Sequence, residues 1–565
     1  MAWLSGFVAC LILWARFRDP TLAANVPLWL GRLARYVGHG RFDERLLTWQ
    51  VDAFWMRLTL TRLAIAITGA YGALLIGLHW GRVRARLVEF FTETRHPIDL
   101  AIFRIVVFAQ IYLETPTPFI RLIASLPREL QFPPETGFPR LGPLRALAYW
   151  PIHPLGGDQV GIWCGVLKVA CVTGMLGVFS RTSALLVSVL FFWVWGSIQW
   201  YGKVDHHHHL LWFALILGVA RSGDALSVDA LYAARRRARR GLTDPPPASN
   251  AYGMPLAFSM LLVGVIYFFP GFWKLATSGF DWALSDNLAH TMYMKWHMLE
   301  GWTPIVRVDR YPLLYMGGGL AVLLLEISFV FLVLGRRTRM IAAWYGIGFH
   351  AATELIMQIS FWSLRNCYVV FFDWHRIFGW IGRRFADGVG HRAPASTAAG
   401  PPPAPAPDPR GRPVAVMIVG GLLVVGNVWA GALAKMDGWP LACYPLFNGI
   451  VGESYETMQI NIVRTDGSER LVVAEDYRDV LGERWNHLLG RILDNPDEEG
   501  KHAQLRAVWR LIAARDPTLA EGELVRFASV QTWLEPERWH EPPGRRRVIY
   551  EFPVSAVSGG AQRLR

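Results

Sequence analysis

The chain has 565 residues, 53% of them hydrophobic, and it contains several apolar runs long enough to cross a membrane. This composition excludes an ordinary soluble protein and indicates a polytopic integral membrane protein. The 57 lysine and arginine residues outnumber the 44 aspartate and glutamate residues, which gives a net charge of +13. In a membrane protein this excess is expected in cytoplasmic loops and against lipid headgroups, so nucleic acid is not an expected partner.

The first region, residues 1–97, is predicted to hold a short apolar span, a mixed segment and a longer span. Met1–Trp14 has neither a basic stretch before it nor a small-residue cleavage site after it, which favours a membrane span over a cleaved signal peptide. Part of residues 16–58 could lie on the membrane as an amphipathic helix. The longer span is expected over 59–79.

Nine further spans are predicted after residue 97. Eight of them form a core over residues 98–380, and the ninth follows a linker rich in Pro and Ala, residues 381–413. The expected spans are 98–114, 161–180, 184–201, 209–221, 256–274, 313–335, 340–358, 362–380 and 414–434. The fold class is therefore an all-α polytopic transmembrane bundle of ten helices, or eleven with the short first one.

The arginine-rich loops all fall on one side of this map, and that side is therefore expected to be cytoplasmic. These loops contain Arg82 to Arg86, Arg181, Arg235 to Arg240, Arg336 to Arg339, and Arg383 with Arg384. The loops 115–160 and 280–312 then face the outside of a bacterial-type inner or plasma membrane.

The C-terminal region, residues 440–565, is predicted to be an α+β domain that also lies outside. Residues 456–475 indicate a hairpin with Asp466-Gly467 at its turn. Amphipathic helices are expected over 475–493 and 501–514, and strands over 524–534 and 546–552. No catalytic or metal-binding motif is evident in this domain.

A cluster of ionisable residues stands directly before the apolar run 210–220 and includes Lys203, Asp205 and His206 to His209. Polar groups near membrane depth are costly unless they are paired or hydrated, so they mark functional sites more often than chance would. Of the four histidines, only His206 and His209 could share a helix face, which makes them the candidate ligands of an unidentified metal. Lys203 could be a base in an apolar pocket, or it could extend to the interface as an anchor.

Three other polar residues in apolar surroundings are candidate site residues. His350 and Glu354 lie one turn apart on the span 340–358 and could bind a ligand, or they could form a buried hydrogen bond between helices. Lys274, at the outer end of its span, could hold a carboxylate or a quinone oxygen, or could anchor the helix. Arg104 is expected to form a structural ion pair, with Glu326 or Glu354 as possible partners.

Four stretches follow one another along the chain: the segment 201–230 with its Lys, His cluster and LSVDA, then YFFPGFWKLATSGFDW (267–282), LEISFVFLVLGRRTR (325–339) and FHAATELIMQISFW (349–362). In this order they resemble the transmembrane core of the vitamin K-dependent γ-carboxylase family, which also occurs in bacteria as the HTTM domain. The sequence departs from the family pattern where Asp205-His206 replaces an Asn-His pair and stands only two residues after Lys203. Asp205 would favour the charged amine and oppose its use as a base.

The resemblance implies a carboxylase-like membrane enzyme of the carbon–carbon lyase type that acts with a reduced quinone, vitamin K or menaquinone, in an outward-facing pocket. In that family a lysine deprotonates the reduced quinone, and here Lys203 would be this base, with His206 beside it. Lys274, His350 and Glu354 would contact the cofactor, and the substrate would be a carboxylate on a peptide or small molecule at the outer face. The alternative is a non-catalytic membrane protein of the same fold that binds lipid, quinone or metal, or serves as a scaffold for a partner. Transport is a third possibility, although no repeated broken helices are evident.

Overall fold

The computed structural model describes residues 2–18, 49–131, 157–199, 201, 207–242, 244–299, 301–388, 413–434, 438–441, 447–482, 484–516, 518–519 and 523–554. The chain forms two compact units. Unit 1 contains residues 1–91, 263–360 and 444–453, and unit 2 contains residues 92–262, 361–443 and 454–565.

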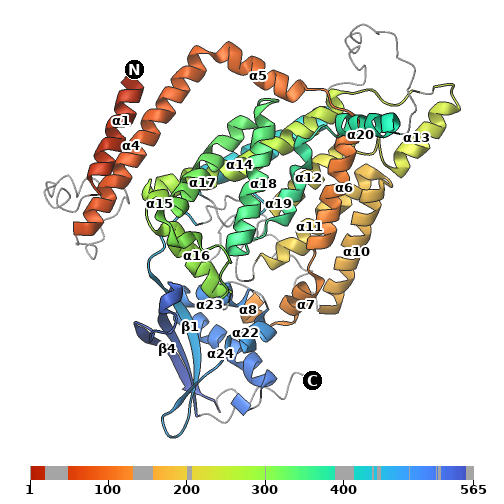
Figure 1. The fold of residues 1–565 in the computed structure, drawn as a ribbon. Helices are drawn as coiled ribbons and strands as arrows, with labels where there is room; N and C mark the ends of the chain where they lie inside the picture. Colours follow the sequence, from red (N-terminus) through yellow and green to blue (C-terminus); the bar gives the residue numbers. More distant parts are fainter. Residues whose placement is uncertain are drawn as a thin grey trace. The chain divides into compact units, whose positions relative to one another are not determined.

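Unit 1 consists of helices. They are α1 (Ala2–Arg16), α4 (Trp49–Leu78), α5 (Trp80–Thr92), the later part of α14 (Asn250–Ser278), α15 (Asp281–Leu284), α16 (Asn287–Met298), η1 (Val308–Arg310), α17 (Pro312–Leu332) and α18 (Thr338–Met357). Helix α1 packs along α4, where the rings of Trp3 and Tyr71 stack with centroids 5.0 Å apart (Figure 1). Helices α14, α17 and α18 form the layer that holds the buried polar residues described below.

Unit 2 combines a helical layer with the C-terminal sheet domain. Its helices before residue 440 are α6 (Pro97–Glu114), α7 (Thr117–Ser125), α8 (Arg128–Gln131), α10 (Gly157–Leu176), α11 (Ser180–Ile198), α12 (His208–Val219), α13 (Val228–Ala238), the first turns of α14, α19 (Trp362–Asn366), η2 (Cys367–Phe371), α20 (Trp374–Gly388) and α21 (Val414–Ala432). Helices α6, α10, α11 and α12 pack against one another, and α21 packs against α12.

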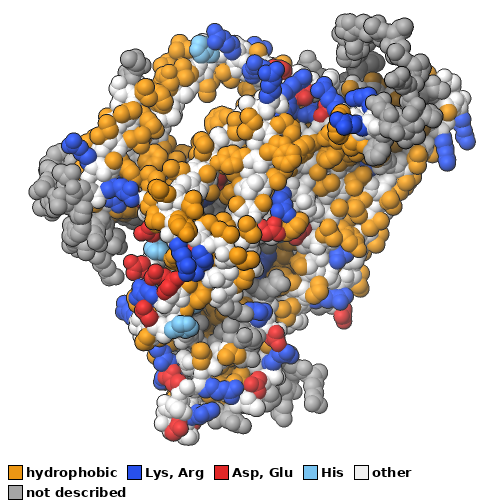
Figure 2. Space-filling model, in the orientation of Figure 1, with side chains coloured by type: hydrophobic (Ala, Val, Ile, Leu, Met, Phe, Trp, Pro, Cys, Tyr) orange, Lys and Arg blue, Asp and Glu red, His pale blue; other side chains and the backbone are white. Residues whose placement is uncertain are grey.

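Within the described residues, five helices are long and apolar enough to cross a membrane: Ala53–Leu78, Asp158–Leu176, Asn250–Ser278, Pro312–Leu332 and Val414–Ala432. Shorter apolar helices cover Trp3–Arg16, Ser180–Gly196 and His208–Val219. On the face drawn in Figure 2, hydrophobic side chains cover much of the helical part of the chain. The described part of the chain is thus largely helical, with the apolar helices of a membrane protein. Within it, length and apolarity identify five candidate spans, fewer than the ten or eleven predicted for the whole sequence.

The predicted span 362–380 is wrong. The structure breaks it into the short helix α19, the 3-10 segment η2 and the separate helix α20. The break lies at Asp373, whose Oδ1 accepts a hydrogen bond from the backbone N of Arg376 at 3.0 Å and so caps the new helix. The sequence suggested one span because aromatic residues are dense here, but Asp373 favours a helix start over a helix interior.

The C-terminal domain has a four-stranded antiparallel sheet in the order β2-β1-β3-β4. Its strands are β1 (Ser454–Val463), β2 (Glu469–Leu471), β3 (Leu524–Trp533) and β4 (Arg546–Pro553), and its helices are α22 (Ala474–Leu481), α23 (Trp485–Leu493), α24 (Glu498–Arg515) and η4 (Pro536–Arg538). The predicted hairpin, both later strands and the helix over 501–514 are confirmed. At the hairpin turn, Ser468 N donates to Asp466 Oδ1 at 2.9 Å.

The predicted helix over 475–493 is instead two helices, α22 and α23, that are separated at Gly482. This glycine has a φ of +73°, which side-chain-bearing residues rarely adopt. A Cβ at this position would also lie 2.9 Å from Leu122 Cδ2 on α7. The chain therefore turns where the domain meets the helical layer of unit 2.

Contacts on both sides of this turn fix the C-terminal domain to one end of α11. Tyr201 Oη donates to Leu481 O at 2.6 Å, and Arg484 Nη1 donates to Ile198 O at 3.0 Å. Gln504 Nε2, on α24, donates to Glu129 O of α8 at 3.1 Å. The domain therefore lies where α11 ends.

Candidate functional site

The predicted catalytic residues Lys203 and His206, together with Asp205, lie outside the described residues. Lys274, His350 and Glu354 are described and belong to unit 1, and His209 belongs to unit 2.

The three described histidines of the cluster pack mainly against aromatic rings. His207 lies 4.5 Å from the ring of Trp195, and its Nε2 is 3.3 Å from Glu114 Oε2. His208 and His209 are each 2% exposed and pack on Trp212 and Phe213. Among the residues with described positions, no three His, Cys, Asp or Glu side chains are grouped so that they could hold a metal ion. A metal site that includes His206 stays a prediction.

Lys274 forms a buried ion pair with Glu326. Its Nζ donates to Glu326 Oε1 at 2.6 Å and to Oε2 at 2.8 Å, and the two residues are 4% and 6% exposed. The ammonium group also lies 5.1 Å from the ring of Trp282. Two charges in an apolar helix layer are tolerated when each satisfies the other, as this pair does.

A glycine on α14 makes room for the carboxylate. Gly271 lies one turn before Lys274 on the same face, and a Cβ on it would lie 2.7 Å from Glu326 Cβ. Only a residue without a side chain therefore lets α17 bring Glu326 this close to α14. Gly271 of the Pro270-Gly271 pair thus makes room for the carboxylate that binds Lys274.

Tyr267 and His350 form a second buried polar contact in the same layer. The phenol oxygen of Tyr267 and Nε2 of His350 share a hydrogen bond of 2.5 Å, which joins α14 to α18. His350 is 2% exposed, and Tyr267 stacks on Phe329 of α17 with ring centroids 4.6 Å apart. Tyr267 lies two turns before Lys274 on α14, so both polar contacts fall along one face of that helix.

His350 and Glu354 differ in burial. Glu354 lies one turn further along α18 and is partly exposed, whereas His350 is buried against Tyr267. Tyr267 was not among the residues predicted from the sequence. An aromatic hydroxyl inside the apolar stretch YFFPGFWK could have pointed to it, because a buried phenol needs a hydrogen-bond partner.

The expected ion pair of Arg104 with Glu326 or Glu354 is wrong. Arg104 is fully buried, and its guanidinium donates to backbone carbonyls, with Nη2 2.6 Å from Leu226 O and 3.3 Å from Met175 O, and Nη1 bonded to Ser222 O. Glu326 is occupied by Lys274. Carbonyl groups at helix ends lack intrahelical partners, and a five-donor guanidinium can satisfy several of them at once.

The LSVDA stretch, which contributes to the family resemblance, has structural partners. Asp229 accepts hydrogen bonds from Phe179 N at 3.0 Å and from Ser180 N and Oγ, both at 2.7 Å, at the start of α11. Ser227 Oγ accepts from Ala230 N at 2.8 Å and caps α13. These two residues therefore begin two helices beside the guanidinium of Arg104.

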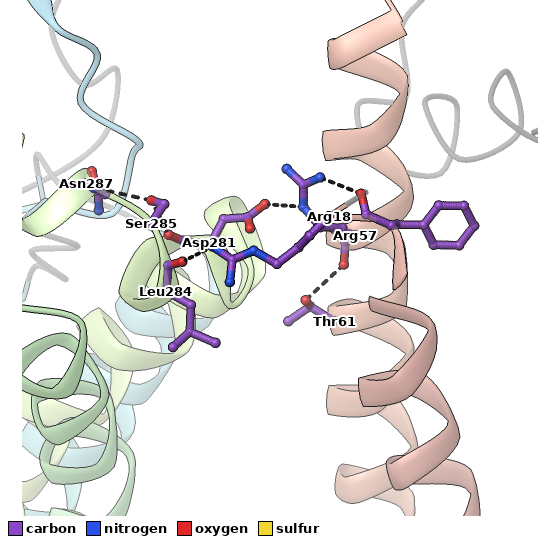
Figure 3. Close-up of polar contacts among 8 residues, drawn as sticks. Arg18, Arg57, Thr61, Asp281, Leu284, Ser285 and Asn287 are labelled. Carbon is purple, nitrogen blue, oxygen red and sulfur yellow. Dashed lines mark hydrogen bonds and ion pairs between the residues drawn. The ribbon is translucent and has the colours of Figure 1, made fainter. Parts of the chain in front are cut away.

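A further ion pair fixes the N-terminal helices to α15 (Figure 3). Arg57 Nε donates to Asp281 Oδ2 at 2.8 Å and its Nη1 donates to Phe17 O at 2.9 Å, while Arg18 Nη2 donates to Leu284 O at 2.6 Å. Burial raises the pKa of Asp281, and the charges of Arg57 and Arg18 oppose that shift. This contact was not predicted from the mixed sequence of residues 16–58.

Residues 447–451 lie along the end of α14 and the helices that follow it. Asn448 O accepts from Thr277 Oγ1 at 2.9 Å, and Val451 N donates to Asn287 Oδ1 at 2.8 Å. Trp282 Nε1 donates to Phe447 O, so the ring that faces Lys274 is held by this segment.

Comparison of the chain with protein-family models, with curated proteins and with solved structures found no match. The resemblance to the carboxylase and HTTM family therefore stays a prediction from the residues quoted above.

Proposed function

We propose that the chain is a carboxylase-like integral membrane enzyme that acts with a reduced quinone, and that Tyr267 and His350 contact the hydroxyl group of that quinone. The observation that carries the proposal is the 2.5 Å bond between a phenol and an imidazole, buried between apolar helices. Lys203 as the base and His206 as its neighbour stay predictions from the family resemblance, because both residues lie outside the described part of the chain.

The residues around this bond suit an aromatic cofactor that carries hydroxyl groups. Phe329 stacks on Tyr267, and Phe349 lies with its ring centroid 5.2 Å from that of His350. Flat apolar rings favour another flat ring by stacking, and the phenol and imidazole offer donors and acceptors at its edge. When bound, a reduced quinone supplies electrons and hydroxyl protons.

The chemistry assigned to this chain is proton handling. Imidazole can accept a proton on one nitrogen near neutral pH, and the hydroxyl of Tyr267 orients the ring of His350 by bonding to Nε2. Lys274 was the expected contact to a quinone oxygen, but its ammonium group is held by both oxygens of Glu326. We therefore assign the pair Lys274–Glu326 to positioning of α14 and α17.

A non-catalytic protein of the same fold that binds lipid or quinone is the second candidate. It is favoured by one observation: Lys274, Arg104 and Asp229, all in or beside stretches that resemble the family, have structural partners. A fold can keep such contacts after the reaction is lost.

The test is an anaerobic titration of the purified protein in detergent with reduced menaquinone or vitamin K, followed by oxygen and labelled bicarbonate. Wild type is compared with Lys203→Ala and His350→Gln, and with His540→Gln, an exposed histidine of the C-terminal domain, as the matched control. We expect quinol oxidation in wild type and control, loss of oxidation in Lys203→Ala, and weakened quinol binding in His350→Gln.

Three outcomes contradict parts of the proposal. Quinol binding without oxidation in any protein would support the non-catalytic candidate. Equal quinol affinity in wild type and His350→Gln would mean that Tyr267 and His350 do not bind the quinol. If no protein bound quinol, the scaffold function would be the remaining candidate.

A further inference from the structure

Two helices at one end of unit 2, α13 and α20, begin close to the first turns of α6. Arg104, in the second turn of α6, bonds to Met175 O at the end of α10 and to Leu226 O just before α13. Helix α20 begins beside the first turn of α6, because His375 N donates to Asp99 Oδ1 at 3.1 Å and the rings of His375 and His96 stack 3.9 Å apart. Both helices therefore start at the same end of this helical layer (Figure 1).

Helix α20 has one face toward the protein and leaves its other faces exposed. Trp374, Ile377 and Ile381 are partly buried and recur at helical spacing. Phe378 and Trp380, which flank this ridge, are 46% and 55% exposed. On the opposite side the exposed cations are Arg376 and Arg383, with Arg384 placed 5.2 Å from the ring of Trp380.

Helix α13 shows the same combination. Leu231 and Tyr232 are 66% and 71% exposed, and the helix ends in a run of arginines. Its Asp229 is bonded to the start of α11, and the carboxylate of Asp373, just before α20, is 3.0 Å from Arg376 Nε. We call the exposed residues of the two helices the basic collar: Leu231, Tyr232, Arg235, Arg236, Arg376, Phe378, Trp380, Arg383 and Arg384.

The basic collar lies where a membrane boundary is expected. The candidate span Asp158–Leu176 ends one residue after Met175, whose carbonyl is bonded to Arg104. A helix with arginines and exposed aromatic side chains at the end of a span has the composition of helices that lie in the headgroup region. A guanidinium group can bind two oxygens of one phosphate at once. Aromatic rings can enter the region between the headgroups and the acyl chains.

We infer that the basic collar binds the headgroups of anionic phospholipids, with α13 and α20 lying in the plane of the membrane. The occupant is a lipid because exposed Phe378, Trp380, Leu231 and Tyr232 accompany the arginines, and a soluble anion would leave these apolar side chains in water.

The inference is tested on the purified full chain by native mass spectrometry after delipidation, with titration of phosphatidylglycerol and, separately, phosphatidylcholine. The variants are Arg376→Gln/Arg383→Gln/Arg384→Gln on α20 and the corresponding Lys triple, which keeps the charge. The matched control is Arg464→Gln/Arg545→Gln/Arg547→Gln, which removes three exposed arginines from the C-terminal domain. We expect the Gln triple on α20 to weaken phosphatidylglycerol binding by about tenfold or more, given the contribution of each basic residue at a membrane surface.

The Lys triple should keep most of this binding, the control should keep all of it, and phosphatidylcholine binding should be equal in every protein. An equal loss in the control, or unchanged phosphatidylglycerol binding in the α20 Gln triple, would overturn the inference. Displacement of the lipid by inorganic phosphate alone at the same concentration would also overturn it, since the surface would then recognise phosphate and not a lipid. A Gln triple that loses binding together with its fold is recognised by its elution profile, and Trp380→Ala then serves as the second variant, with weaker lipid retention expected.

Discussion

Lys274 and Glu326 each make the burial of the other tolerable. With Lys274 replaced by Met, the carboxylate of Glu326 would remain 6% exposed and uncompensated. Breaking a buried ion pair by removing one partner costs about 3–5 kcal/mol. We therefore expect Lys274→Met to lower the unfolding free energy by about that amount, and Lys274→Met/Glu326→Gln to recover most of it, as measured by thermal or denaturant unfolding in detergent.

The control for this pair is Lys501→Met, in the C-terminal domain, because Lys501 pairs with the largely exposed Glu498 at 2.8 Å. Loss of a pair with an exposed partner should lower the unfolding free energy much less than loss of the buried pair, because solvent screens the exposed charge. If the Lys274 and Glu326 replacements are simply additive, the two charges are not coupled and the positioning role assigned to them is wrong.

The LSVDA stretch contacts helix ends in unit 2. Asp229 caps α11 through three hydrogen bonds, and loss of a capping side chain costs about 0.5–2 kcal/mol. We expect Asp229→Ala to lower the melting temperature in detergent while the affinity of the folded fraction for reduced quinone is unchanged. Asp244→Ala, at an exposed position, is the matched control. Loss of quinol affinity in Asp229→Ala at full folding would contradict the structural assignment and place Asp229 in the site.

The elements that the sequence predicted well are those with a local cause. The hairpin at Asp466-Gly467 follows from turn chemistry and alternating side chains, and the structure has it. The helix α20 was missed because Trp374, Phe378 and Trp380 made residues 362–380 resemble an apolar span, although its arginines lie on one side only. The amphipathic pattern of α20, rather than its mean apolarity, distinguishes it from a membrane span.

The candidate site was predictable only in part, because its partners are distant in the sequence. Lys274 and His350 were identified as unusual in apolar runs, but Glu326 is 52 residues from Lys274, and Tyr267 is 83 residues from His350. Periodicity shows which face of a helix a residue occupies and does not show which helix faces it. Arg104 illustrates the limit, since its partners are backbone carbonyls that no side-chain pattern reveals.

At the scale of the whole molecule, α11 separates two chemically different ends of unit 2. Its first residues are capped by Asp229 beside α13, and Ile198 at its last turn accepts from Arg484 of the C-terminal domain. Its 19 residues span about 28 Å, close to the roughly 30 Å of a hydrocarbon core. If α11 crosses the membrane, the arginines of α13 and the C-terminal domain lie on opposite sides, and the excess of positive charge assigns the outer side to the domain.

This topology is tested by cysteine labelling of sealed vesicles of known orientation with a membrane-impermeant maleimide. Arg547→Cys lies on β4 and Arg236→Cys on α13, both at exposed positions, whereas the native Cys10, Cys164, Cys171 and Cys367 are buried. We expect Arg547→Cys to react in right-side-out vesicles and Arg236→Cys only in inverted ones, because a charged reagent does not cross the bilayer. Wild type measures the background from native cysteines, and detergent-solubilised samples show that both positions can react.

Labelling of both positions from one side would mean that α11 does not cross the membrane. The reverse pattern would keep α11 as a span and place the C-terminal domain inside. The arginine-rich helix ends would then lie outside, against the positive-inside rule.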